Sequence, residues 1–142
     1  MTPTLVGRWQ TRLLLLSTVG VLVSLPFCFG VFGTPASWSY VLILGYIALF
    51  GLVWDWCYMS LQNFRWDRDW PGIFQLLAGI WEAGFLIIFA KVLPLPGIAP
   101  EGINLQLFIW HYSLVWVGVY TASQTMMRLL FPYWRFRGGR WF

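Results

Sequence analysis

Four stretches of this chain are long, apolar and almost free of charged side chains, and each could cross a lipid bilayer. They cover residues 13–33, 38–58, 73–92 and 105–127. Because the hydrocarbon core of a bilayer is about 30 Å thick and a helix rises about 1.5 Å per residue, roughly 20 apolar residues span it. The stretches are too long for strands and lack strict alternation, which disfavours a β-barrel. The sequence therefore predicts an all-α polytopic membrane protein with four transmembrane helices.

The composition leads to the same class of protein. Apolar residues make up 59% of the 142 residues and charged residues 10%, whereas soluble domains have roughly 45–50% and about 25%. So few charges cannot cover the surface of a soluble domain, and a disordered chain would lack this apolar bulk. With short connections and no visible repeat, residues 1–142 are expected to form a single membrane helical bundle.

The basic residues predict the orientation of this bundle. Lys and Arg gather on the cytoplasmic side of membrane proteins. In a four-span arrangement Lys91 falls alone on one side, and eight arginines fall on the other: Arg8, Arg12, Arg65, Arg68, Arg128, Arg135, Arg137 and Arg140. We therefore expect both termini to be cytoplasmic. Residues 128–142 form a basic, aromatic tail that is expected to lie on an anionic bilayer surface.

The residues that bind metals and redox cofactors are scarce. Cys28 and Cys57 lie 29 residues apart and His111 is the one histidine, so a CxxC redox pair, a zinc site and a bis-histidine haem within the chain are all excluded. We predict no metal and no cofactor. Two tryptophans deep in the predicted spans, Trp81 and Trp116, leave open a bound lipid or a hydrophobic pigment.

Glu82 is the most informative polar residue, because it lies near the middle of the third predicted span. A charge there costs about 2.5–3.5 kcal/mol on insertion scales. Helical spacing predicts one polar, small-residue face made of Gln75, Ala78, Gly79, Glu82 and Leu86. One interpretation is a proton- or ligand-binding site formed by Glu82 with Gln75. The other is an interhelical hydrogen bond that fixes the packing, which we favour because no second mid-membrane charge is apparent.

Other polar residues near the predicted span ends offer weaker candidates. Asp55 and Arg128 should lie at similar depth and are predicted as an interhelical polar pair. The alternative is that each side chain reaches separately to lipid headgroups. His111, between Trp110 and Tyr112, is expected to be an ordinary interfacial histidine near the outer end of its span.

The connection between the second and third spans interleaves charges of both signs with tryptophan. Asp69 and Pro71 suit the start of the following helix. The remaining pattern predicts either a fixed network of salt bridges or a docking surface for a partner, formed by Arg65, Trp66, Asp67, Arg68, Asp69 and Trp70.

This segment also carries a resemblance. Residues 65–71, with Gln75, Glu82 and the Gly138-Gly139 pair of the arginine-rich tail, resemble small bacterial membrane proteins of cyanobacterial and actinobacterial type. The resemblance brings no assigned activity and transfers no functional residue. It implies a bacterial inner (plasma) membrane or a thylakoid membrane.

These observations together favour a non-enzymatic subunit, anchor or assembly partner of a larger membrane complex. Its expected partners are the lipid bilayer and other membrane or cytoplasmic subunits, or further copies of itself, and not nucleic acid. The alternative is a small oligomeric transporter that couples to protons or cations through Glu82. An enzyme is disfavoured because one glutamate and one distant histidine do not make a catalytic cluster.

Overall fold

A computed structural model of the chain describes residues 3–33, 35–93, 95–98 and 104–141. These residues contain helices and no strand. The helices are α1 (Leu5–Leu15), a π-helical turn η1 (Leu16–Gly20), α2 (Val21–Cys28), α3 (Ser39–Asn63), α4 (Gly72–Val92), α5 (Leu105–Gln124) and the short α6 (Met126–Leu130).

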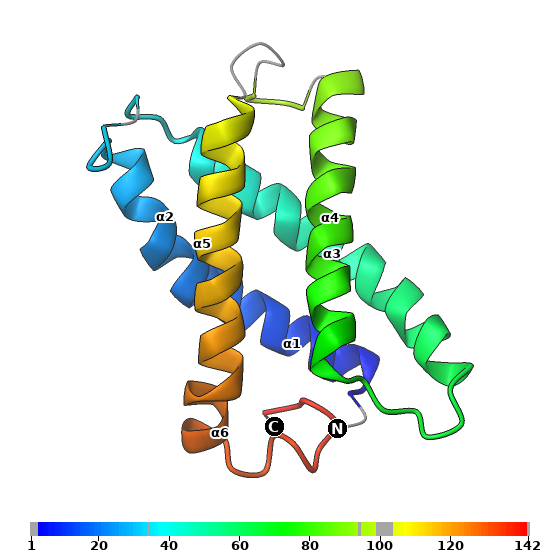
Figure 1. The fold of residues 1–142 in the computed structure, drawn as a ribbon. Coiled ribbons are helices and arrows are strands. Elements are labelled where there is room, and N and C mark those ends of the chain that lie inside the picture. The colour runs from blue at the N-terminus through cyan, green and yellow to red at the C-terminus, as the bar shows by residue number, and fades with distance from the viewer. Residues whose placement is uncertain (1–2, 34, 94, 99–103, 142) are drawn as a thin grey trace.

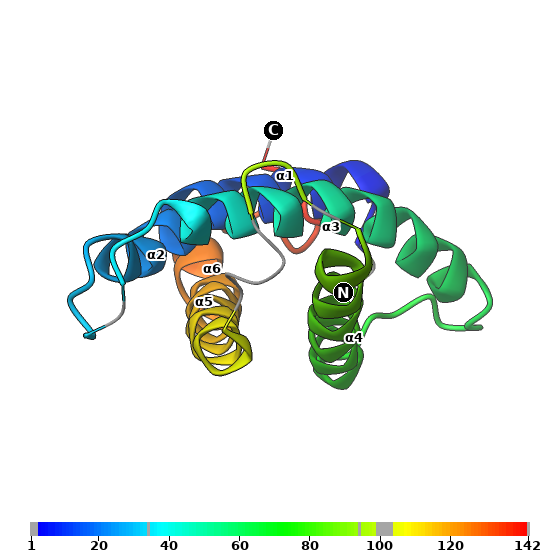
Figure 2. The ribbon, with the colours of Figure 1, turned by 90° about the horizontal axis from the view of Figure 1, so that it is seen from above.

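The helices form two layers. The first layer consists of α1, η1 and α2, which run as one bent rod, and of α3, which returns antiparallel beside it (Figure 1). Seen from above, α4 and α5 stand in front of this layer and apart from each other (Figure 2). Apolar side chains from both layers make the main core, among them Leu16, Ile43, Leu86 and Val115.

The bend in the first rod has a local cause. The hydroxyls of Ser17 and Thr18 donate to the carbonyl of Leu14, at 3.1 and 2.7 Å. Such back-bonding competes with the regular backbone ladder and bends helices, and a π-helical turn follows. Gly20 ends this turn and lets the rod approach Leu44 of α3, whose side chain would lie 3.1 Å from an added Cβ.

Within the described residues, three helices are long and apolar enough to cross a membrane: Leu5–Cys28, Ser39–Asn63 and Gly72–Val92. The fourth predicted span corresponds to α5, which is not among them. Its 20 residues include Gln106, His111 and Gln124, and these polar side chains make it less apolar than the other three. The prediction of a membrane protein therefore holds, while the count of four spans is not confirmed.

The first helix begins earlier than the sequence predicts. It starts at Leu5 rather than near residue 13, with Thr4 as N-cap accepting from the amide of Gly7. Arg8 and Arg12 therefore lie inside the helix and not before it. This difference places two cationic side chains within the bundle.

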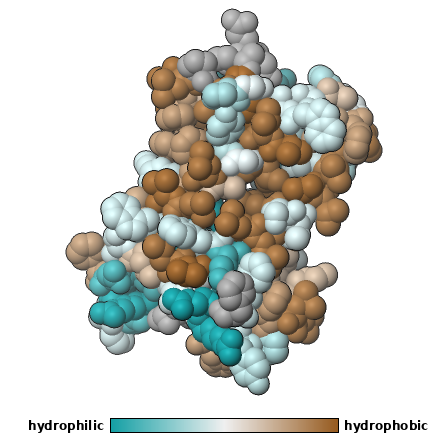
Figure 3. All heavy atoms as spheres, turned by 180° about the vertical axis from the view of Figure 1, so that it is seen from behind, coloured by the Kyte–Doolittle hydropathy of each residue, from teal (hydrophilic) through white to brown (hydrophobic). Residues whose placement is uncertain are grey.

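The surface has the polarity expected of a membrane protein. Viewed from behind, apolar residues cover most of the upper part, and hydrophilic residues gather toward the lower end (Figure 3). Many large apolar side chains on the helices are exposed, including Leu22, Leu49, Ile80 and Ile88. In the described part of the chain the two ends meet at the polar end, where the amide of Thr4 donates to the carbonyl of Gly138 at 2.7 Å.

Candidate functional site

Three helices meet at a buried ion-pair cluster centred on Arg12 of α1. The Arg12 guanidinium donates to both oxygens of Asp55 on α3, with Nε–Oδ2 and Nη2–Oδ1 distances of 2.9 Å. It also donates to both oxygens of Glu82 on α4, with Nη1–Oε2 at 2.8 Å and Nη2–Oε1 at 2.9 Å. The Asp55 and Glu82 side chains are only 4% and 10% exposed. One cation thus links two carboxylates through bidentate contacts, the strongest geometry for such pairs.

The backbone of α3 leaves room for this guanidinium. A Cβ on Gly51 would lie 2.3 Å from Nη1 of Arg12. Gly51 is one turn before Asp55, so both lie on the same face of α3. A second arginine lies one turn before Arg12: Arg8 donates to Oε1 of Gln62 at 2.9 Å and lies 4.4 Å from the centre of the Trp70 ring.

The helical face predicted around Glu82 is present. Gly79, Glu82 and Leu86 are all buried along one side of α4, and Gln75 lies one turn earlier on that side. The sequence interpretation found no second mid-membrane charge because it counted Arg12 as a residue that flanks the first span. Two features of the sequence are consistent with the ion pairing of Arg12. Arg8 and Arg12 are one helical turn apart, and Gly51 precedes Asp55 by one turn.

The predicted pair of Asp55 with Arg128 is replaced by a different pairing. Both Asp55 oxygens accept from Arg12, since α1 packs directly on α3. Arg128 belongs to α6 and donates to the side-chain oxygen of Gln124. Asp55 is 3% exposed, so its carboxylate does not reach separately out of the bundle either.

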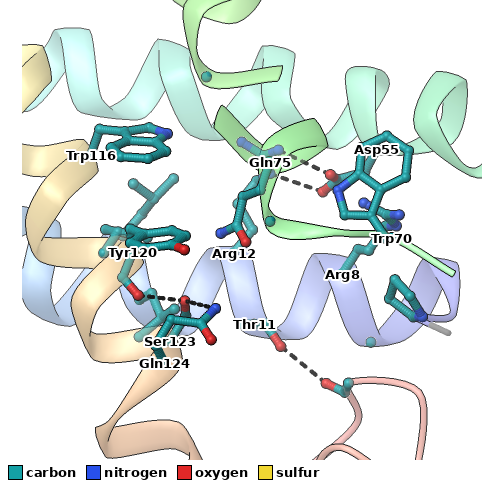
Figure 4. Close-up of a pocket in the computed structure, with 18 of the residues that line it drawn as sticks. Arg8, Thr11, Arg12, Asp55, Trp70, Gln75, Trp116, Tyr120, Ser123 and Gln124 are labelled. Atoms are coloured by element: carbon teal, nitrogen blue, oxygen red, sulfur yellow. Dashed lines mark hydrogen bonds and ion pairs between the residues drawn. The ribbon is translucent and has the colours of Figure 1, made fainter. Parts of the chain in front are cut away.

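A cavity of about 470 Å³ lies next to the cluster, between α1, α4, α5 and the C-terminal tail (Figure 4). In this view Gln75 lies between Tyr120 of α5 and Asp55 of α3. The Trp116 and Tyr120 rings stack at 5.0 Å with an interplanar angle of 9° and form part of the wall. Small-molecule sites in proteins typically measure about 300–1,000 Å³, so this cavity is large enough for a ligand.

The C-terminal tail covers one side of the cavity. Trp134, 7% exposed, donates from Nε1 to the Thr11 hydroxyl at 2.9 Å, and this hydroxyl donates to the Gly139 carbonyl at 3.0 Å. Gly7 permits the contact, because a Cβ there would lie 2.1 Å from the Gly138 carbonyl oxygen. Trp134, Gly138 and Gly139 of the tail thus contact α1 and its N-cap Thr4, and the expected position of the tail on a bilayer surface stays a prediction.

The charged connection between α3 and α4 forms a local salt bridge. Arg65 donates to both oxygens of Asp67, at 3.0 and 2.8 Å, and the amide of Asp69 donates to Oδ1 of Asp67 at 3.2 Å. The hydrogen bonds from Arg65 and from the backbone lower the pKa of Asp67 to about 2. Arg68 adopts a left-handed conformation, with φ of 49°, which helps to close the turn.

The two tryptophans of this connection differ. Trp66 is 96% exposed, whereas Trp70 contacts Arg8, Tyr58 and Phe74. Trp70 therefore belongs to the bundle. Nothing in the structure tests whether the connection docks a partner, so that role stays a prediction.

His111 is fully buried in the bundle. Its Nε2 lies 2.8 Å from the hydroxyl oxygen of Ser24, which itself donates to the Gly20 carbonyl at 2.8 Å. The rings of Phe27 and Tyr40 pack on the imidazole at 5.1 and 5.2 Å. His111 lines neither described cavity, and its contacts are those of a packing residue.

Comparison with protein families, with curated proteins and with solved structures finds no match for this chain. Among the described residues, no group of three or more His, Cys, Asp and Glu side chains could hold a metal ion.

Proposed function

We propose that this protein is a non-enzymatic integral membrane subunit that binds an amphiphilic small molecule in the cavity beside Arg12. The observation that carries the proposal is the cavity itself, whose wall combines the Arg12–Asp55–Glu82 ion-pair cluster with stacked aromatic rings and amide side chains. Polar groups held in place inside an apolar bundle typically mark a ligand site. A bacterial inner or thylakoid membrane is the proposed location.

The charges of the wall favour binding over acid–base chemistry. Both oxygens of Asp55 and of Glu82 accept from Arg12. A carboxylate held in a bidentate ion pair is oriented toward its partner and not toward a substrate in the cavity. The two carboxylates instead hold the guanidinium, and the cluster serves as a fixed polar wall.

The alternative of a proton- or cation-coupled transporter stays a prediction. Protonating Glu82 would weaken its ion pair with Arg12, and breaking a buried pair on one side typically costs about 3–5 kcal/mol. Transport through Glu82 would therefore require a substantial rearrangement of α1 against α4.

Filling the cavity tests the proposed function. Gln75→Trp introduces a large ring into the lining, whereas Leu77→Trp adds the same ring on an exposed position of the same helix. After incubation with bacterial polar lipid extract in detergent, native mass spectrometry should find a bound amphiphile on the wild type and on Leu77→Trp. We expect Gln75→Trp to reduce its affinity by about tenfold or more, equivalent to about 1.4 kcal/mol.

Equal occupancy in the two tryptophan variants would contradict ligand binding in this cavity. Thermal unfolding in the same detergent verifies that both variants are folded. A smaller substitution, Ser123→Leu, reduces the cavity from the α5 side and should lower occupancy in the same direction.

We also propose that α5 is a fourth span and that both termini are cytoplasmic. The contact between Thr4 and Gly138 keeps the described ends on one side, which fits an even number of crossings. Arg65 and Arg68 in the α3–α4 connection, together with the four arginines of residues 128–140, supply the orientation. Reporters fused after residue 142 and inserted within 93–104 should lie on opposite sides of the membrane. Finding both reporters on one side would refute the four-span topology.

A further inference from the structure

The cavity changes in polarity along its length. Its wall on α1 runs from Arg8 through Arg12 to Leu15 and Leu16, a rise of about 12 Å at 1.5 Å per residue. On α5 the wall runs in the opposite chain direction, from Gln124 at the polar end to Tyr112 at the inner end. The outer part is therefore polar and the inner part is mainly apolar and aromatic, apart from the Arg12–Asp55–Glu82 cluster.

The outer part carries cationic side chains that no described carboxylate pairs with. The described lining contains Arg8, Arg12, Arg128 and Arg135, against the carboxylates of Asp55 and Glu82. Both carboxylates bind Arg12. Among the described residues, the other three arginines form no ion pair. In addition, the Nε–H group of Arg8 is buried with no hydrogen-bond partner.

We infer that the ligand is a phosphate-headed anionic membrane lipid whose headgroup lies among Arg8, Arg128 and Arg135. This inference rests on the proposed binding function and names the class of ligand. Guanidinium groups bind phosphate oxygens in paired, charge-assisted contacts. Basic pockets between membrane helices typically hold anionic headgroups. The headgroup would supply the negative charge that the outer part of the cavity lacks.

The inner wall favours a lipid over a free phosphate ion. Val115, Val119 and Leu16 provide apolar contact, and the stacked Trp116 and Tyr120 rings line the same stretch of the cavity. A free anion would leave this apolar surface uncovered. A lipid places its phosphate at the arginines and its glycerol and first methylenes along the apolar wall.

The C-terminal tail contributes to the headgroup site. Arg135 follows Trp134, which is fixed to Thr11 of α1, and Arg128 lies on α6 at the start of the same segment. Arg137 and Arg140 belong to the tail as well, are exposed and do not line the cavity. They provide a matched control with the same change of charge.

The test measures lipid selectivity in detergent micelles by native mass spectrometry. The wild type should bind phosphatidylglycerol about tenfold or more tightly than phosphatidylcholine of the same chain length. The double variant Arg128→Gln/Arg135→Gln should lose most of this selectivity and fold normally. The double variant Arg137→Gln/Arg140→Gln should keep it, because it removes the same charge away from the cavity.

Each other outcome overturns a defined part of the inference. Equal binding of the two lipids, with Gln75→Trp still reducing both, would refute the anionic headgroup and leave the proposed function intact. If Gln75→Trp left phosphatidylglycerol binding unchanged, the cavity would not be the site and both proposals would fail.

If glycerol phosphate alone bound as tightly as phosphatidylglycerol, the lipid would be refuted in favour of a soluble phosphate. Equal loss of selectivity in both arginine variants would indicate attraction by net charge and refute the headgroup site.

Discussion

Replacing Arg12 with leucine is expected to lower the free energy of unfolding by about 3–5 kcal/mol, the cost of removing one partner from a buried ion pair. The substitution leaves Asp55 and Glu82 close together without the cation that both contact. Two uncompensated carboxylates inside a bundle must be protonated, hydrated or moved apart. Each of these responses weakens the packing of α1 against α3 and α4.

The measurement is denaturant unfolding in a fixed detergent, followed by tryptophan fluorescence. A triple variant, Arg12→Leu/Asp55→Asn/Glu82→Gln, removes all three charges and should recover much of the loss, since an apolar or neutral replacement of a buried pair is often tolerated. Arg128→Leu is the matched control, because Arg128 is exposed and pairs with Gln124; we expect a change below about 1 kcal/mol. If Arg12→Leu lowered the free energy of unfolding no more than this control does, the cluster would not hold the bundle together.

The position of Glu82 illustrates what could be predicted from the sequence. Its helix face follows from spacing alone, because Gly79, Glu82 and Leu86 recur at helical intervals, and the structure buries all three. The partner of Glu82 could not be found in this way. Hydropathy sets the start of a span at the first uncharged residue, which puts Arg12 outside, whereas the helix itself begins at Leu5.

Contacts between residues far apart in the sequence account for the other differences between the prediction from the sequence and the structure. His111 has aromatic neighbours in sequence and therefore resembles an interfacial residue, but its buried partner Ser24 is 87 residues away. The tail is basic and aromatic, which favours a bilayer surface, yet Thr4 bonds to Gly138, 134 residues away. No local pattern encodes such contacts, so the cavity that they enclose could not be predicted from the sequence.

The contact between the tail and α1 depends on Gly7, and substituting this glycine is expected to release the tail. Substituting alanine for glycine inside a helix normally stabilises it by about 1 kcal/mol. At Gly7 the sign should reverse, because the added Cβ would lie 2.1 Å from the Gly138 carbonyl oxygen, a backbone atom that cannot rotate away. The tail must then leave α1 and lose the burial of Trp134 and its hydrogen bond to Thr11.

Limited trypsin digestion in detergent measures this release, since Arg135, Arg137 and Arg140 all lie in the tail. We expect Gly7→Ala to raise the initial rate of tail cleavage by about tenfold, the factor that corresponds to about 1.4 kcal/mol of lost docking. Gly84→Ala is the control, because a Cβ at that helical glycine meets nothing within 4 Å, and its cleavage rate should match the wild type. If Gly7→Ala were cleaved no faster than Gly84→Ala, the tail would not be held by this contact. Faster cleavage together with weaker phosphatidylglycerol binding would link the docked tail to the headgroup site, since Arg135 reaches the cavity only from a tail that lies on α1.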